Sequence, residues 1–260
     1  MEGLNVEPVR FATADAGEEA FARFRRDGYL VLDQFIAADF AADLLAALRA
    51  RHPDYFVTTE GRYAVGDRRF IAPVVMSDMF ADPRLIMHEG LAAVADGLLG
   101  RRWVIDAFGV VVSLPGSEDQ HIHHDGGMLF GIEPLDRMLP TTALTVGVPL
   151  VAVDASHGRT ELWPGTHRTP GPVDGSEPGA EPDLLPGSAA LWDFRIRHRG
   201  RANHSDEPRP FLYFTLCLPW WIDHRNFKRD GDPKLLIAAA TFAALPELWR
   251  KRFERVVVID

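Results

Sequence analysis

Short apolar runs separated by glycine- and proline-rich turns fill the sequence from Trp103 onward. Runs of this length, bounded by turn residues at close spacing, are typical of the strands of an antiparallel sandwich or barrel. The sequence therefore predicts a β-rich body whose strands lie within the runs 103–114, 143–153, 160–163, 188–197 and 210–219.

The first fifty residues have a different pattern, in which a strand lies between two helices. A short helical stretch over 21–26 is broken by Asp27-Gly28, and the apolar run 29–32 is a plausible strand. Asp39 is a good N-cap for an alanine- and leucine-rich helix that continues to about Arg49.

The remaining segments outside the predicted strands are a mixture of helix and irregular chain. Residues 53–80 are expected to be irregular, and a second helix covers roughly 91–99, with Gly100 as its C-terminal stop. The Pro-, Gly- and acid-rich segment 171–186 reads as a mobile surface loop, for which a lid function is a further possibility. A final helix is predicted over about 233–253.

Length and composition limit the class of protein. The chain has 260 residues, of which 47% are hydrophobic and 25% charged, and no repeat or boundary divides it, so we expect one domain over 1–260. The net charge of −9 argues against nucleic acid as a main partner. No apolar run reaches the ~18 residues of a membrane span, and the N-terminus does not resemble a secretory signal. The single cysteine, Cys217, fits a reducing compartment, and we expect a cytoplasmic protein of undetermined oligomeric state.

Three histidines and an aspartate lie close together in the segment 120–125. Because side chains two residues apart on a strand share a face, His123 and Asp125 would point the same way and His124 the other way. Such a pair supplies two ligands of a 2-His-1-carboxylate facial triad, which leaves open positions on iron for O₂ and a cosubstrate. His121 has the same parity and is a rival ligand, ranked second because the H-x-D pair supplies the carboxylate directly.

The run 192–198 supplies a candidate for the third ligand. Phe194, Ile196 and His198 share one parity, which predicts a strand with its apolar side and His198 facing inward. Three residues of the opposite parity are expected to form a solvated face: Arg195, Arg197 and Arg199.

Arg209 opens the next apolar run, after a turn rich in polar residues. If the two runs form a hairpin centred at 203–204, Arg209 lies opposite His198 and on the same face. A buried arginine needs a charged partner, and the carboxylate of a metal-bound cosubstrate would allow a bidentate contact. The alternative is an edge arginine that pairs with Asp206 or Glu207.

Motifs found in order along most of the chain resemble those of a known enzyme family. They are Asp27-Gly28-Tyr29 with the strand and helix that follow, Pro115-Gly116, Gln120-x-x-His123-x-Asp125, Gly158-x-Thr160, Pro164-Gly165-Thr166-His167-Arg168 and His198-x-Gly200-x-x-Asn203-x-Ser205-x-x-x-Arg209. Together they resemble the phytanoyl-CoA dioxygenase family of iron(II)- and 2-oxoglutarate-dependent oxygenases.

The resemblance implies a mainly β fold with flanking helices, namely a double-stranded β-helix or cupin-like jelly roll. It implies that His123, Asp125 and His198 bind iron(II), with 2-oxoglutarate and O₂ as cosubstrates. It also implies that Arg209 binds the distal carboxylate of 2-oxoglutarate.

The resemblance extends to residues around the cosubstrate. Gln120 and Thr160 match positions that often help to hold 2-oxoglutarate. Some relatives carry a serine two residues after the distal histidine, where this chain has Gly200, so a side-chain contact is expected to be lost. The presence of Asp125 favours hydroxylation or another C–H oxidation, because related halogenases lack this carboxylate.

These observations predict a dioxygenase that oxidises, and most simply hydroxylates, an unactivated C–H bond of a small-molecule metabolite. Desaturation, epimerisation and ring closure begin from the same hydrogen abstraction and stay open. The alternative is a cupin-type isomerase, lyase or binding protein that uses His121, His123 and His198 without 2-oxoglutarate. A third hypothesis is a family member that has lost catalysis and acts as a binding module. O₂ uptake that depends on 2-oxoglutarate would distinguish the dioxygenase from both of these alternatives.

Overall fold

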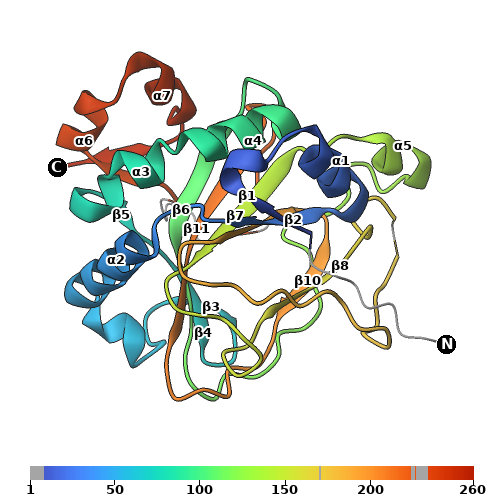
Figure 1. The fold of residues 1–260 in the computed structure, drawn as a ribbon, viewed down its shortest axis with the longest axis horizontal. Coiled ribbons are helices and arrows are strands. Elements are labelled where there is room, and N and C mark those ends of the chain that lie inside the picture. The colour runs from blue at the N-terminus through green and yellow to red at the C-terminus, as the bar shows by residue number, and fades with distance from the viewer. Residues whose placement is uncertain (1–8, 170, 224–225, 227–233) are drawn as a thin grey trace.

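An eight-stranded sheet forms the centre of the fold in the computed structural model, which describes residues 9–169, 171–223, 226 and 234–260 (Figure 1). Its order is β1-β2-β9-β7-β11-β6-β4-β3. The strands are β1 (Arg10–Ala12), β2 (Tyr29–Asp33), β3 (Tyr63–Gly66), β4 (Arg69–Pro73), β6 (Val104–Ser113), β7 (Ala143–Pro149), β9 (Ala189–Asp193) and β11 (Arg209–Cys217).

A smaller sheet faces the large one across a pocket. It contains β8 (Thr160–Trp163) and β10 (Arg197–Gly200), which pair antiparallel. Residues of both sheets line the same pocket, for example Thr160 on β8 and Phe211 on β11. This arrangement of two facing sheets confirms the predicted double-stranded β-helix.

β11 shows how the sequence pattern builds the two sides of the large sheet. Its even-numbered apolar residues Leu212, Phe214 and Leu216 are buried in the main hydrophobic core. Its odd-numbered residues lie on the other face and line the pocket: Arg209, Phe211, Tyr213 and Thr215. The period of two along a strand therefore separates the core from the candidate site.

Helices cover the core side of the large sheet, as Figure 1 shows for α1, α3 and α4. The helices are α1 (Glu18–Asp27), α2 (Ala38–Arg51), α3 (Pro83–Ile86), α4 (Glu89–Leu99), α5 (Glu133–Met138), α6 (Ala239–Ala244) and α7 (Glu247–Arg252). The predicted helices near 21–26, 39–49 and 91–99 correspond to α1, α2 and α4, and Gly28 and Gly100 directly follow α1 and α4 as C-terminal caps. Within the described residues, none of these helices is long and apolar enough to cross a membrane.

The expectation that 53–80 is irregular is wrong. This stretch contains β3, β4, β5 (Val75–Met76) and the 3-10 helices η2 (Pro53–Phe56) and η3 (Asp78–Ala81). β4 pairs with β6 over five residues, and its Phe70 and Ala72 enter the core. Its strand structure comes from this long-range pairing, which local sequence does not reveal.

The prediction of a single helix over 233–253 is also wrong. Position 233 itself lies outside the described residues. The chain forms β12 (Leu236–Ala238), α6 and α7, and β12 pairs in parallel with both β5 and β13 (Val257–Ile259). α6 ends at Ala244, and the next residue, Leu245, has an extended backbone (φ −63°, ψ 134°) and precedes Pro246. A residue before proline avoids the helical region, which explains the break.

The run 188–197 is not one strand, because β9 ends at Asp193 and β10 begins at Arg197. The Asp193 carboxylate accepts hydrogen bonds from the Arg195 backbone N–H (2.9 Å) and guanidinium (2.9 and 2.8 Å). Both side chains are buried, so the prediction of a solvent-exposed Arg195 is wrong. Trp192, Phe194 and His198 nevertheless all line the same pocket, on both sides of the turn.

Asp193→Asn is expected to destabilise the protein by about 3–5 kcal/mol, because it leaves the buried Arg195 without a charged partner. Chemical denaturation measures the change in the free energy of unfolding. Glu247→Gln is the control, since the exposed Glu247–Lys251 pair should contribute at most about 0.5 kcal/mol. Equal effects of the two substitutions would contradict the importance of the buried pair.

Candidate metal centre

A cavity of about 570 Å³ lies between the two sheets and contains the predicted site residues. His123, Asp125 and His198 line it, and their donor atoms all lie within 4.8 Å of one another. The Nε2 atom of His198 is 3.5 Å from Oδ1 of Asp125, and the centres of the two imidazole rings are 4.4 Å apart. Residues from distant parts of the chain thus form one cluster with the composition of a facial triad.

A pair of backbone hydrogen bonds brings the two histidines together. The His123 N–H donates to the His198 carbonyl (2.9 Å) and the His198 N–H donates to the His123 carbonyl (2.8 Å). They are therefore directly opposed antiparallel partners, whose side chains share a face. The segment 120–125 makes only this isolated bridge, so the prediction that it forms a strand is wrong although His123 and Asp125 do converge.

The backbone also selects which nitrogen of each histidine faces the cluster. Nδ1 of His123 lies 2.9 Å from the His121 carbonyl, and Nδ1 of His198 lies 3.2 Å from the Ile196 carbonyl. If each Nδ1 carries the proton and donates it, each Nε2 keeps its lone pair for a metal. Burial, together with the charge of the nearby His198, lowers the pKa of His123, which favours the neutral form that a metal ligand needs.

Asp125 is held by two side chains from the large sheet. Its Oδ2 accepts a hydrogen bond from Thr145 Oγ1 (2.8 Å) and from Trp192 Nε1 (3.0 Å). Burial alone would raise the pKa of the Asp125 carboxyl, but the charges of the two histidines and these hydrogen bonds outweigh it and lower the pKa. Thr145 and Trp192 lie in predicted strands, but neither was predicted to contribute to the site.

The rival ligand His121 lies outside the cluster of donor atoms. Its side chain is exposed, and its ring centre is 5.2 Å from that of His123. The geometry therefore favours His123, whose backbone is paired directly with His198.

Arg209 is buried in the same cavity, as predicted, but the predicted hairpin is not what places it there. The predicted hairpin is wrong: β10 pairs with β8, and β11 pairs with β6 and β7. Arg209 reaches the cavity because it has the same parity on β11 as Phe211. Among the described residues it forms no ion pair, and the alternative pairing with Asp206 or Glu207 is absent there.

A second arginine, Arg69 on β4, lies beside Arg209 and was missed by the sequence analysis. Ser113 on β6 is the register partner of both, so the three residues form one row across neighbouring strands. Burial, and the positive charge of Arg69, lower the pKa of Arg209 to about 9. Arg209 donates to the Gly158 carbonyl, and within the described part of the chain the Nε atoms of both arginines have no hydrogen-bond partner. Two buried cations without a described acid partner make this end of the cavity suited to a carboxylate.

Gln120, Thr160 and Gly200 surround this basic end. The Gln120 Oε1 atom accepts from the Gly200 N–H (2.8 Å), and its Nε2 donates to the Val65 carbonyl. A side chain at Gly200 would place its Cβ 2.8 Å from Arg69 Nη1 and 2.8 Å from Gln120 Oε1. The Arg69 guanidinium thus occupies the space where a serine at this position would project.

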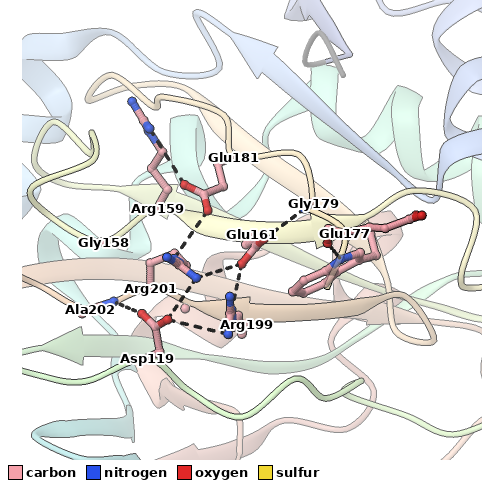
Figure 2. A network of polar contacts seen from close by, with 12 residues as sticks. Asp119, Gly158, Arg159, Glu161, Glu177, Gly179, Glu181, Arg199, Arg201 and Ala202 are labelled. Carbon is pink, nitrogen blue, oxygen red and sulfur yellow. Dashed lines mark hydrogen bonds and ion pairs between the residues drawn. The ribbon is translucent and has the colours of Figure 1, made fainter. Parts of the chain in front are cut away.

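The outer side of β10 is fixed by the ion-pair network in Figure 2. The buried Glu161 on β8 accepts from Arg199 (2.7 Å), Arg201 (3.2 Å) and the Gly179 N–H (3.0 Å). Arg199 is therefore paired with a buried acid, so the predicted solvated face is wrong here as well. The network connects the strand that carries His198 to the irregular 171–186 segment.

Comparisons with known proteins concern the chain as a whole and not its individual site residues. Residues 24–211 match the family model described as phytanoyl-CoA dioxygenase (PhyH). Dioxygenase FrzG of Cladobotryum sp is 28% identical over 231 residues, which cover 78% of this chain and 75% of that protein.

Solved structures are similar over most of the chain. The non-haem alpha-ketoglutarate-dependent epimerase SnoN from nogalamycin biosynthesis is 27% identical, with a TM-score of 0.61 over 77% of this chain and 82% of that one. SnoN has also been solved in complex with Fe³⁺, alpha-ketoglutarate and nogalamycin RO. HygX from Streptomyces hygroscopicus, solved with nickel and 2-oxoglutarate, is 15% identical with a TM-score of 0.65 over 80% and 90% of the two chains, a likeness of fold.

Proposed function

Because the chain belongs to the phytanoyl-CoA dioxygenase family, we propose that it is an iron(II)- and 2-oxoglutarate-dependent oxygenase with His123, Asp125 and His198 as metal ligands. The observation that carries this proposal is one cavity that holds both a His/Asp/His cluster and an arginine with no acid partner among the described residues. The family assignment supports a 2-oxoglutarate-dependent oxidoreductase, and the chain 1–260 is proposed to act as one domain.

The residues present fit the metal and the cosubstrate. Two imidazole nitrogens and one carboxylate oxygen are the donor set of non-haem iron(II) oxygenases. Iron, 2-oxoglutarate and O₂ together supply the oxidising chemistry when they are bound. The protein holds the ligands, keeps the His123 imidazole neutral, and provides a cavity with aromatic walls at Trp192 and Phe211.

Arg209 is proposed to bind the carboxylate of 2-oxoglutarate that is remote from the metal. Its guanidinium is buried, and the neighbouring Arg69 adds a second positive charge to that end of the cavity. A carboxylate there would relieve the repulsion between the two cations and form charge-assisted hydrogen bonds. Gln120 and Thr160 are proposed to border the cosubstrate.

A small-molecule metabolite is the proposed main substrate, and hydroxylation of one of its C–H bonds is the simplest outcome. SnoN is an epimerase whose complex contains nogalamycin RO, so epimerisation is an alternative outcome of related chemistry. Tyr213, whose buried hydroxyl has no hydrogen-bond partner among the described residues, lines the cavity with Thr215 and Asp223, which supports a substrate with polar groups. The single cysteine, Cys217, fits the proposed cytoplasmic location.

Anaerobic addition of iron(II) and 2-oxoglutarate together is expected to produce a visible metal-to-ligand charge-transfer band. At concentrations about 100-fold above the dissociation constant, ligand binding should stabilise the fold by about 2.7 kcal/mol and raise Tm by roughly 5–10 °C. A screen of metabolites for succinate release under O₂ then identifies the substrate. Metal binding without any response to 2-oxoglutarate would contradict the proposal and favour a cupin-type isomerase, lyase or binding protein.

A further inference from the structure

Two hydrogen bonds to the same oxygen fix the orientation of the Asp125 carboxylate. Thr145 on β7 and Trp192 on β9 are register partners in the large sheet, so their side chains lie on one face. Both donate to Oδ2 of Asp125, at 2.8 and 3.0 Å. A carboxylate oxygen that accepts two hydrogen bonds has its lone pairs largely engaged.

The other carboxylate oxygen has a different environment. Oδ1 lies 3.5 Å from Nε2 of His198, within the cluster of candidate donor atoms. Among the described residues it accepts no hydrogen bond, because both donors to this carboxylate reach Oδ2. The two oxygens of the Asp125 carboxylate therefore differ: Oδ2 is hydrogen-bonded to the sheet, and Oδ1 faces the histidines.

We propose that Trp192 and Thr145 are positioning residues that make Asp125 a single-oxygen metal ligand through Oδ1. This inference rests on the proposed function. A second Asp125 oxygen on the metal would occupy a position that a facial triad leaves open for cosubstrate and O₂. The two donors keep Oδ2 away from that position and also limit rotation of the carboxylate about its Cβ–Cγ bond.

The Trp192 indole is itself held tightly in the pocket wall. A Cβ atom added at Gly147 would lie 3.3 Å from both Cη2 and Cζ3 of Trp192, so glycine leaves room for the ring. On its other side, the indole ring centre is 5.4 Å from that of His198. Trp192 therefore contacts two of the three candidate ligands, through its N–H and its ring.

The test removes each hydrogen bond while keeping the shape of the side chain. Trp192→Phe keeps an aromatic ring without the indole N–H, and Thr145→Val replaces the hydroxyl by a methyl group. Cobalt(II) and iron(II) affinities are measured anaerobically by calorimetry on metal-free protein. Each variant is expected to bind about 10–100-fold more weakly, as is usual when a residue that orients a ligand is changed. The visible spectrum of bound cobalt(II) should also change, because it reports the number and geometry of the ligands.

Trp163→Phe is the matched control, because the Trp163 N–H donates to the Glu177 carbonyl (2.9 Å) outside the cavity. Its metal affinity and cobalt(II) spectrum should equal those of the wild type. If Trp192→Phe does not fold, as judged by circular dichroism and thermal melting, Thr145→Val decides the matter alone.

The outcomes separate this inference from the proposed function. The positioning role would be overturned if the folded variants kept the wild-type metal affinity and the wild-type cobalt(II) spectrum. This applies to Thr145→Val, and to Trp192→Phe where that variant folds. The oxygenase proposal would remain intact. A wild-type protein that binds neither metal would overturn both.

Discussion

Alanine at His198 or at Asp125 is expected to abolish turnover and to weaken iron(II) binding, while the fold stays intact. Each substitution removes one donor atom from a cluster whose members lie within 4.8 Å of one another. The loss of affinity should exceed the roughly 10–100-fold typical of residues that only orient ligands. Anaerobic calorimetry with iron(II) measures the affinity, and succinate release measures turnover.

His121→Ala is the matched control, because His121 is exposed and lies outside the cluster of donor atoms. It should keep most of its iron affinity, whereas His123→Ala should behave like His198→Ala. The reverse result, with iron lost in His121→Ala and kept in His123→Ala, would show that the ligand assignment is wrong by two residues.

The candidate ligands could be predicted from sequence because the chemistry of their residue types is specific. His123 and Asp125 stand two residues apart, and this spacing places both side chains on one face of any extended segment. The segment forms only an isolated bridge, yet both side chains line the same cavity.

The pairing of β10 could not be predicted from local sequence. A strand of four residues followed by a polar turn suits a hairpin with the next strand, because closing a short loop costs the least entropy. Its actual partner is β8, and the pairing is reinforced on its outer side by Arg199 and Glu161. The ion pair depends on contacts between segments far apart in the chain.

Arg69 was missed for a related reason. Nothing in its local sequence distinguishes it from the surface arginines of this arginine-rich chain. Its burial follows from the position of β4 between β6 and β3, where Arg69 reaches the Gly200 (3.1 Å) and Arg201 (2.7 Å) carbonyls. The basic end of the cavity is thus a property of the sheet order.

The two arginines also distinguish the proposed oxygenase from a cupin-type isomerase or lyase. A metal site that acts without 2-oxoglutarate has no need of a buried arginine beside the metal. Keeping Arg209 charged in this environment is unfavourable, and its pKa is lowered to about 9 by burial and by Arg69. At neutral pH the group is still protonated, so the unfavourable charge persists until an anion binds.

Arg209→Met is therefore expected to weaken the binding of 2-oxoglutarate without lowering the stability of the protein. Without Arg209, the remote carboxylate of 2-oxoglutarate loses its closest proposed partner, at a cost of roughly 3–5 kcal/mol. Since ~1.4 kcal/mol corresponds to a tenfold change, KM for 2-oxoglutarate should rise at least about a hundredfold. The cation with the lowered pKa is removed, so the unfolding free energy of the metal-free protein at pH 7 should not fall.

Three measurements test this expectation together: the charge-transfer titration with 2-oxoglutarate, iron(II) binding without cosubstrate, and chemical denaturation of the metal-free protein. Only the first should change strongly, since Arg209 is not a proposed metal ligand. Arg209→Lys should recover part of the affinity, because one ammonium group cannot reproduce a bidentate contact. Arg195 provides the contrast, since its ion pair with Asp193 (2.8 Å) lies outside the cavity, and its substitution should lower stability without raising KM for 2-oxoglutarate. Unchanged 2-oxoglutarate dependence in Arg209→Met would mean that the carboxylate binds elsewhere, with Arg69 as the first alternative, because it is the other buried arginine in the row that crosses Ser113.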